Sequence, residues 1–190
     1  MKFLETRLTG AFVLELELHG DSRGFFARTY SAEEFVAHGL ESNFVQCNLS
    51  LSRQKGTLRG LHFQWAPHAE VKLVRCVRGA IRDVIMDLRP GSPTFGHHEA
   101  VELSADNRRA FYVPKGFAHG FQSLTNDAEV YYHMGHVYVP ESSAGIQALD
   151  PALGIKWPLP VTEMSDKDRG LPTLAQVKER LMRQPAPGNS

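Results

Sequence analysis

The sequence predicts a mainly β protein, an antiparallel jelly roll with short peripheral helices. Many short runs are rich in apolar residues and have the length of a strand, and clusters of Pro, Gly, Asn and Asp separate them. Only two segments carry apolar residues at helical spacing. Many short strands with two helices at the periphery are typical of an antiparallel sandwich or barrel.

Composition indicates one ordinary globular domain. The chain has 190 residues, of which 42% are hydrophobic and 22% charged. We expect residues 1–183 to form the domain and 184–190 to be a flexible tail. Lys plus Arg equals Asp plus Glu at 21 each, so no bulk charge favours a nucleic acid or a membrane as partner. Two cysteines, no signal peptide and no membrane-length apolar run predict a cytoplasmic protein with reduced thiols.

The first predicted strand, residues 12–18, alternates strictly in polarity. Phe12, Leu14, Leu16 and Leu18 would share one face, with Glu15 and Glu17 on the other. Further strands are predicted at residues 44–49, 58–64, 71–77, 80–88, 98–103, 110–113, 120–124 and 129–139. Between two of these strands, Arg78-Gly79 suits a tight hairpin, because Gly79 can adopt a positive φ.

Two helices are predicted. Ser31-Ala-Glu-Glu34 is a capping box, which opens a short helix that ends at Gly39. Leu174, Val177 and Leu181 recur at helical spacing and indicate an amphipathic helix near the C-terminus.

Two histidines lie in motifs with the spacing of cupins. Pro114-Lys-Gly-Phe-Ala-His119 has the Pro-x-Gly-x-x-His spacing of the second cupin motif. Gly56-Thr-Leu-Arg-Gly-Leu-His62-Phe-Gln64 occupies the place of the first motif, but Gln64 replaces its second histidine and no glutamate follows. Because a catalytic metal site commonly has three imidazole or carboxylate ligands, we expect neither a metal nor another cofactor.

His62 is therefore predicted to act as an acid or base. A histidine titrates near neutral pH, although most histidines are only hydrogen-bonded structural residues. Arg59 precedes His62 by three positions and Lys72 follows on the next predicted strand. Both cations are candidates for contact with an anion or an enolate.

Several further motifs resemble the dTDP-4-dehydrorhamnose 3,5-epimerase family, a group within the cupins. They are Gly20-Asp-Ser-Arg-Gly-Phe-Phe26, Gly56 to Gln64, Lys72-Leu-Val-Arg-Cys76, Ser92-Pro-Thr-Phe-Gly96, Pro114 to Phe121, Asp150 to Pro158 and Ser165-Asp-Lys-Asp168. The motifs follow the family's order and cover roughly residues 5 to 172, which is more specific than any single motif.

The resemblance implies roles for individual residues. By position, His62 matches the proton acceptor, Asp168 its carboxylate partner and Tyr132 the proton donor. Lys72 matches the lysine at the keto oxygen. The remaining matches imply contacts with the nucleotide sugar at Arg23, Arg28, Gln46, Asn48, Arg59, His119, Tyr138 and Lys167. Strand pleat alone would not distinguish Tyr132 from Tyr131 as the acid.

These residue types suit epimerisation at C3, C5 or both of a nucleotide-linked 4-keto-6-deoxy sugar. The C4 ketone acidifies both neighbouring protons, and Lys72 could stabilise the enolate that a base leaves behind. Inversion requires reprotonation from the opposite face, so the acid and the base must be different residues. We expect positive charge near Tyr132 to lower its pKa toward neutrality.

Some positions depart from the family pattern and leave the substrate open. Arg28 stands where an acidic residue is usual, and Ser143 where a substrate-binding glutamate is expected. A CDP- or GDP-linked sugar offers acceptors that Arg28 could satisfy. The sequence is also compatible with a single-position epimerase, a metal-dependent cupin enzyme or a non-catalytic cupin binding module.

The resemblance also implies a homodimer. Its N-terminal strand around residues 12–18 would cross to the partner sheet and bring Arg23 and Arg28 to the neighbouring active site.

Overall fold

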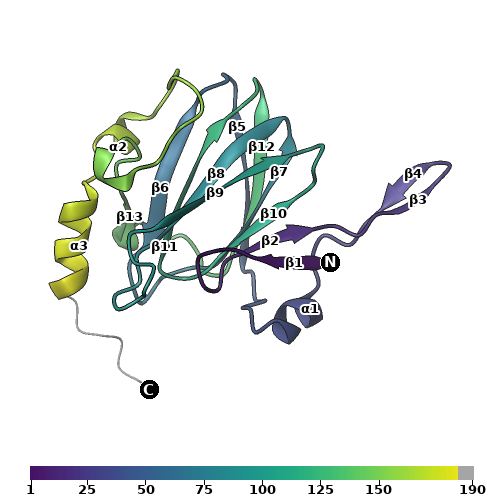
Figure 1. Cartoon of the computed structure of the whole chain (residues 1–190), viewed down its shortest axis with the longest axis horizontal. Helices are drawn as coiled ribbons and strands as arrows, with labels where there is room; N and C mark the ends of the chain where they lie inside the picture. The colour runs from purple at the N-terminus through teal and green to yellow at the C-terminus, as the bar shows by residue number, and fades with distance from the viewer. Residues whose placement is uncertain (184–190) are drawn as a thin grey trace.

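Two facing antiparallel sheets make up the body of the computed structural model, which describes residues 1–183 (Figure 1). The six-stranded sheet has the order β1–β2–β10–β7–β12–β5 and comprises Lys2–Glu5 (β1), Phe12–Glu15 (β2), Ala110–Val113 (β10), Lys72–Arg78 (β7), Ala128–Met134 (β12) and Gln46–Ser52 (β5). The five-stranded sheet has the order β13–β6–β11–β8–β9 and comprises Ser143–Gly145 (β13), Leu58–Gln64 (β6), Phe117–Ser123 (β11), Ala80–Asp87 (β8) and His98–Ser104 (β9). The predicted jelly roll is confirmed.

Apolar side chains fill three layers. The first lies between the sheets and joins Val74 and Phe111 of one sheet to Ile85 and Phe121 of the other. The second covers the outer face of the five-stranded sheet, and the third covers part of the outer face of the six-stranded sheet around Phe35. Successive side chains of a strand point to opposite faces of its sheet. Side chains that do not belong to these apolar layers can therefore point into the space between the sheets.

Helices lie at the periphery, as predicted. Helix α1 (Ala32–Ala37) begins after Ser31, whose side chain accepts a hydrogen bond from the Glu34 amide, and it is followed by Gly39 at φ +70°. Helix α3 (Leu174–Arg183) packs its apolar side against the five-stranded sheet (Figure 1). Helix α2 (Asp166–Arg169) and the 3₁₀ turns η1 (Pro140–Ser142) and η2 (Pro151–Leu153) were not predicted. The tail predicted at 184–190 lies outside the described residues.

The predicted hairpin at Arg78-Gly79 is wrong. Strand β7 pairs with β10 and β12, whereas β8 pairs with β11 and β9, so the chain passes from one sheet to the other at this point. Gly79 does adopt a positive φ of +71°. A Cβ at Gly79 would also clash with the Thr125 hydroxyl oxygen, so a larger residue would not fit there. The glycine therefore serves a crossover between the two sheets and not a hairpin turn.

Several strand ends also differ from the prediction. β2 stops at Glu15, and Leu18 beyond it is exposed, because pairing with β1 and β10 ends there. β12 stops at Met134 rather than at Val139, and β11 begins at Phe117 rather than at Gly120. Four short strands were missed, namely β1, β13 and the pair His19–Asp21 (β3) and Gly24–Phe26 (β4).

A bulge in β6 turns two functional side chains toward the same space. His119 of β11 lies opposite His62, but Phe121 lies opposite Arg59, so β6 has one extra residue between these pairs. Strict alternation would send Arg59 and His62, three positions apart, to opposite faces. The bulge lets both face the interior of the sandwich.

Glycines at the bulge allow β6 and β11 to approach each other, and we predict a stability loss when one is filled. In Gly120→Ala the new Cβ would lie 2.4 Å from the Arg59 carbonyl oxygen and 2.8 Å from Cδ2 of Leu61. We expect the free energy of unfolding to fall by about 1–3 kcal/mol, measured by urea denaturation. Gly20→Ala, whose Cβ would lie 3.6 Å from its nearest neighbour, should change it by about 0.5 kcal/mol or less.

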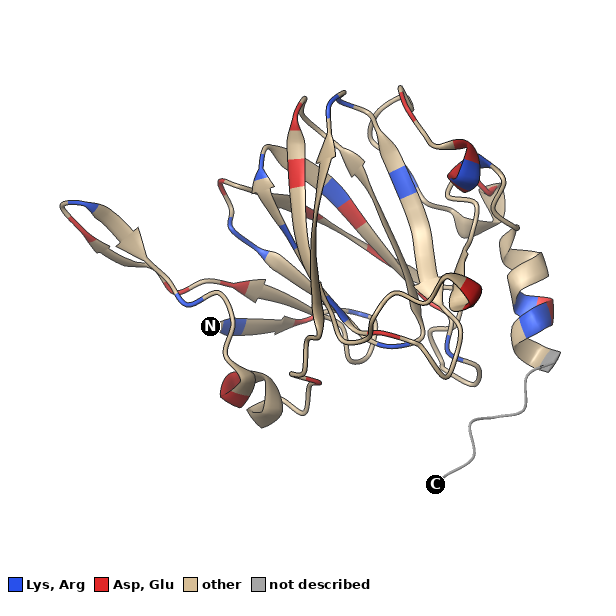
Figure 2. Cartoon of the chain, turned by 180° about the vertical axis from the view of Figure 1, so that it is seen from behind, with Lys and Arg blue, Asp and Glu red and all other residues tan. Residues whose placement is uncertain are grey.

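Charged residues are interspersed over the described chain. Lys and Arg positions lie among Asp and Glu positions on the strands, turns and helices (Figure 2). None of the helices within residues 1–183 is long and apolar enough to cross a membrane.

Candidate active site

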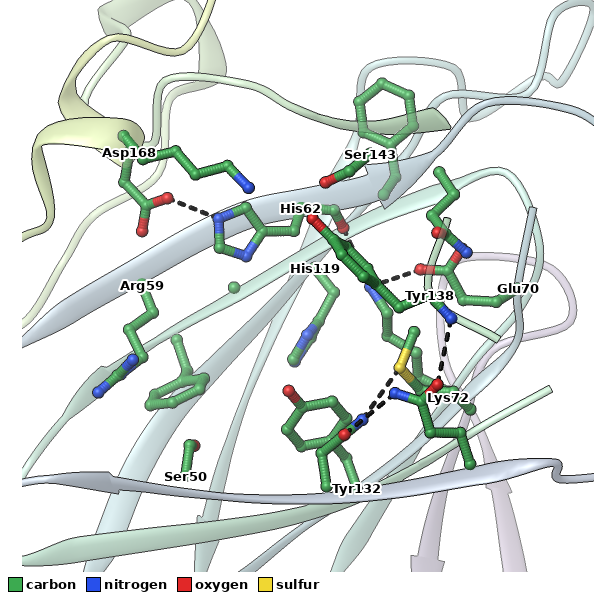
Figure 3. A pocket seen from close by; sticks show the side chains of 18 of the residues that line it. Ser50, Arg59, His62, Glu70, Lys72, His119, Tyr132, Tyr138, Ser143 and Asp168 are labelled. Atoms are coloured by element: carbon green, nitrogen blue, oxygen red, sulfur yellow. Dashed lines mark hydrogen bonds and ion pairs between the residues drawn. The ribbon is translucent and has the colours of Figure 1, made fainter. Parts of the chain in front are cut away.

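A cavity of about 480 Å³ opens between the two sheets (Figure 3). One wall comes from β6, β11 and α2, and the other from β5, β7 and β12. Most of its polar lining is formed by Gln46, Asn48, Ser50, Arg59, His62, Gln64, Glu70, Lys72, His119, Tyr132, Tyr138, Ser143, Ser165, Lys167 and Asp168. Residues from distant parts of the chain therefore meet in one pocket.

His62 and Asp168 form a short imidazole–carboxylate pair in the first wall. His62 Nε2 lies 2.6 Å from Asp168 Oδ1, and Asp168 also accepts a hydrogen bond from the Gly60 amide at 3.1 Å. The His62 side chain is 42% exposed, whereas that of Asp168 is only 6% exposed. The imidazole is therefore open to the cavity and its carboxylate partner is sheltered behind it.

Helix α2 holds Asp168 in place. Ser165 caps the helix and accepts a hydrogen bond from the Asp168 amide at 3.1 Å. Burial raises the pKa of the Asp168 carboxyl, but the hydrogen bonds from His62, Gly60 and Ser165 outweigh it and leave the pKa below its usual value. An ionised Asp168 can only accept hydrogen bonds, so His62 donates through Nε2 and presents Nδ1 to the cavity.

The lowered pKa of Asp168 predicts a pH-dependent contribution to stability. Because the pKa is lower in the folded state, the ionised group stabilises the fold above its unfolded pKa of about 3.9, and this stabilisation is lost as the pH falls through the folded value. The free energy of unfolding, measured by urea denaturation, should therefore exceed that of Asp168→Asn most near neutral pH in the wild type. This difference should shrink below about pH 4. A difference that stays constant over that range would contradict this assignment.

Lys72 reaches across the cavity from the opposite sheet. Its Nζ donates a hydrogen bond to the His62 carbonyl oxygen at 3.2 Å and forms an ion pair with Glu70 Oε1 at 3.0 Å. The side chains of Lys72 and Glu70 are 8% and 3% exposed. The Lys72 amine is therefore held beside the backbone carbonyl of His62.

A second imidazole–carboxylate pair lies deeper in the sandwich. His119 Nε2 lies 2.8 Å from Asp83 Oδ1 of β8. Burial raises the pKa of Asp83, while His119 and Lys72 act in the opposite direction. The cavity therefore holds two histidines, each oriented by a carboxylate.

Tyr132 faces the same cavity from the second wall, opposite His62 (Figure 3). Its neighbour Tyr131 points to the other side of the sheet, where Cys47 hydrogen-bonds with it. The expected lowering of the Tyr132 pKa is wrong: burial raises the pKa, and the opposing effect of Arg59 is smaller. Tyr132 therefore holds its proton at neutral pH.

Most of the residues predicted to bind substrate line this cavity, and two do not. Those that line it are Gln46, Asn48, Arg59, His119, Tyr138 and Lys167. Arg23 lies on the β3–β4 hairpin, which projects away from the sandwich, and it pairs with Asp21 (Figure 1). Arg28 is exposed and lies 3.7 Å from Glu34. Within one chain, neither arginine lines the cavity.

Gln64, which replaces a metal-ligating histidine of the cupin motif, braces the cavity wall. Its Nε2 donates to the carbonyl oxygens of His68 and Val137, and its Oε1 accepts from the Val139 amide at 2.7 Å. Within residues 1–183, no group of three or more His, Cys, Asp and Glu side chains is placed to hold a metal ion.

Sequence reasoning missed three acidic or hydroxyl side chains of the site. Asp83 and Glu70 lie behind His119 and Lys72, and Ser50 lines the cavity with a hydroxyl that has no hydrogen-bond partner within the described chain. Asp83 could have been found from the sequence, because it is a carboxylate within a predicted buried strand and a buried charge needs a partner. Glu70 stood between predicted strands and gave no comparable signal.

Comparison with known proteins places these features in a family. The family model for dTDP-4-dehydrorhamnose 3,5-epimerase matches residues 5–176. The dTDP-4-dehydrorhamnose 3,5-epimerase of Methanothermobacter thermautotrophicus is 46% identical over 171 residues, covering 88% of this chain and 91% of the relative. The crystal structure of the Bacillus anthracis enzyme with TDP and PPi bound has a TM-score of 0.88 at 46% identity, covering 91% of this chain and 99% of that one.

A solved enzyme of different regiochemistry is also similar. The 3'-monoepimerase ChmJ from Streptomyces bikiniensis, in complex with dTDP-quinovose, has a TM-score of 0.85 at 38% identity and covers 93% of this chain and 89% of that one.

The jelly roll and the polar cavity between its sheets define a protein of the cupin type. Its family follows from the comparisons. The chain belongs to the dTDP-4-dehydrorhamnose 3,5-epimerase family, whose members are isomerases.

Proposed function

We propose that the protein epimerises a dTDP-linked 4-keto-6-deoxy sugar at C3 and C5 by proton abstraction and reprotonation. The observation that carries this proposal is the opposition of the His62–Asp168 pair and Tyr132 across one cavity. Inversion at carbon needs a base on one face and an acid on the other, and binding alone needs neither.

The base in this proposal is His62 through Nδ1. Asp168 accepts the Nε2 hydrogen, fixes the tautomer and stabilises the imidazolium that forms when the substrate proton is taken. Nearly half of the His62 side chain is accessible, so a sugar ring can reach it.

The enolate in this proposal is stabilised by Lys72. An ammonium has three N–H donors, of which one is hydrogen-bonded to the His62 carbonyl, and the group also forms an ion pair with Glu70. The ammonium can still donate to the C4 oxygen, where negative charge develops. The His119–Asp83 pair lines the same cavity and can add a second donor.

The acid in this proposal is Tyr132. Burial raises its pKa, so the phenol is protonated when the enolate forms. Donation from the wall opposite His62 gives the inverted configuration. The remaining lining residues Gln46, Asn48, Arg59, Tyr138 and Lys167 would hold the nucleotide sugar.

A single-position epimerase is the second candidate. It is favoured by the similarity to a 3'-monoepimerase with a TM-score of 0.85. The two candidates share the base, the acid and the enolate contact, and they differ in how many carbons exchange.

Deuterium wash-in from D2O tests both candidates. The protein is incubated with dTDP-4-dehydro-6-deoxyglucose, and deuterium at C3 and C5 is followed by NMR. Exchange with inversion at both carbons supports the 3,5-epimerase, and exchange at one carbon supports the single-position enzyme. The same sugar linked to CDP or GDP tests the role of Arg28. No exchange with any carrier would overturn the proposal.

We also propose that the protein acts in the cytoplasm as a homodimer in which the β3–β4 hairpin reaches the partner. Both cysteines are free, which suits a reducing compartment. Phe26 on the hairpin is 70% exposed and Leu49 on the outer face of β5 is 62% exposed. β2 pairs with β10 in the sheet of its own chain. We therefore expect the β3–β4 hairpin, with Arg23 at its tip, to be the part that crosses to the partner.

Light scattering tests the homodimer. Wild type should have twice the mass of one chain, and Leu49→Glu should lower it toward the mass of one chain because a charge would be buried at the contact. A wild-type protein with the mass of one chain would contradict the proposal.

A further inference from the structure

We propose that Glu70 is a positioning residue of the active site, which holds Lys72 oriented toward the enolate oxygen. The inference rests on the proposed function, because it assigns Lys72 the contact with the developing negative charge. Glu70 itself is not expected to touch the sugar.

The geometry places Glu70 directly behind the lysine. Glu70 lies two residues before Lys72, the first residue of β7, and both line the cavity, whereas Val71 between them packs into the outer apolar layer. Glu70 Oε1 lies 3.0 Å from Lys72 Nζ. Its second oxygen, Oε2, is buried and has no hydrogen-bond partner among the described residues.

This arrangement is unfavourable for folding alone. A buried carboxylate with an unpartnered oxygen has lost hydration that a single ion pair does not fully replace. Such a group suits a functional demand better than a structural one. Here the demand is a fixed position for the Lys72 ammonium, whose side chain is 8% exposed.

Other groups around Lys72 do not hold its ammonium in this way. His62 of β6 offers its backbone carbonyl, and Tyr132 of β12 is neutral at neutral pH. Asp83 of β8 interacts electrostatically with Lys72, but its hydrogen bond is to His119 of β11. Among residues 1–183, only Glu70 forms an ion pair with Lys72. Its carboxylate therefore fixes one side of the ammonium.

The test compares the rate of deuterium wash-in with the affinity for dTDP. We expect Glu70→Gln to lower the exchange rate at saturating substrate by about tenfold or more, because the Lys72 ammonium loses the carboxylate that fixes its direction. The affinity for dTDP, measured by titration calorimetry, should stay within about twofold of wild type, because Glu70 does not touch the nucleotide. We expect Glu70→Asp, which keeps the charge at shorter reach, to lower the exchange rate by less.

Controls separate this inference from the proposed function and from misfolding. Glu99→Gln removes the 2.8 Å ion pair between Glu99 of β9 and Arg7, outside the cavity, and should leave the exchange rate unchanged. If Glu70→Gln does not fold, Glu70→Asp alone carries the test. An unchanged exchange rate in the folded Glu70 variants overturns the role of Glu70, while exchange in wild type still supports the proposed function. Absence of exchange in wild type overturns the proposed function itself.

Discussion

Replacing His62 with alanine is expected to lower deuterium exchange at C3 and C5 by about 10³-fold. A buried carboxylate orients the His62 imidazole through Nε2, and this imidazole is far more open to the cavity than that of His119, with 42% against 10% of the side chain exposed. Without it, Asp168 remains sheltered behind the wall and cannot reach a sugar proton. The measurement is wash-in from D2O with dTDP-4-dehydro-6-deoxyglucose, read by NMR.

A matched histidine controls for this result. His98 lies on β9 and does not line the cavity, so His98→Ala should exchange at the wild-type rate. The free energy of unfolding of His62→Ala should fall by about 1–3 kcal/mol, because the buried Asp168 loses its hydrogen bond, so exchange is compared at a temperature at which the variant is folded. Exchange in His62→Ala at more than about a tenth of the wild-type rate would show that another group is the base.

The fold could be predicted from the sequence where a pattern is local. The strand at residues 58–64 and the helix after the capping box at Ser31 follow from a short apolar-rich run between turn signals and from helix-end hydrogen bonding, and both elements are present. The crossover at Gly79 could not be predicted in this way. A glycine with positive φ serves a hairpin and a change of sheet equally, and the difference depends on long-range pairing of β7 with β10.

The residues of the site could likewise be predicted where a local pattern marks them, and not where packing decides. His62, Lys72 and His119 lie in motifs, Tyr132 matches the family by position, and the structure brings all four into one cavity. The pKa direction of Tyr132 was wrong because burial and charge oppose each other, and their balance depends on packing that no motif records. The bulge that turns Arg59 and His62 to one side is equally invisible, since it exists only in the pairing of β6 with β11.

Tyr132→Phe is expected to separate proton removal from inversion. The variant loses only the phenolic oxygen, so His62 can still take a proton, exchange it with solvent and return deuterium to the same face. We expect inversion to fall by about 10²–10⁴-fold, with exchange retained within about tenfold of wild type. NMR measures both quantities in one sample, because deuterium incorporation reports exchange and the coupling constants report inversion.

The tyrosine on the other side of the sheet provides the control for this variant. Tyr131 interacts with Cys47 away from the cavity, so Tyr131→Phe should leave both exchange and inversion unchanged. Inversion that survives in Tyr132→Phe would assign the acid to another donor, for which His119 with its Asp83 partner is the nearest candidate in the same cavity. Equal loss of exchange and inversion would instead place Tyr132 in the first step, as a donor to the enolate oxygen rather than to carbon.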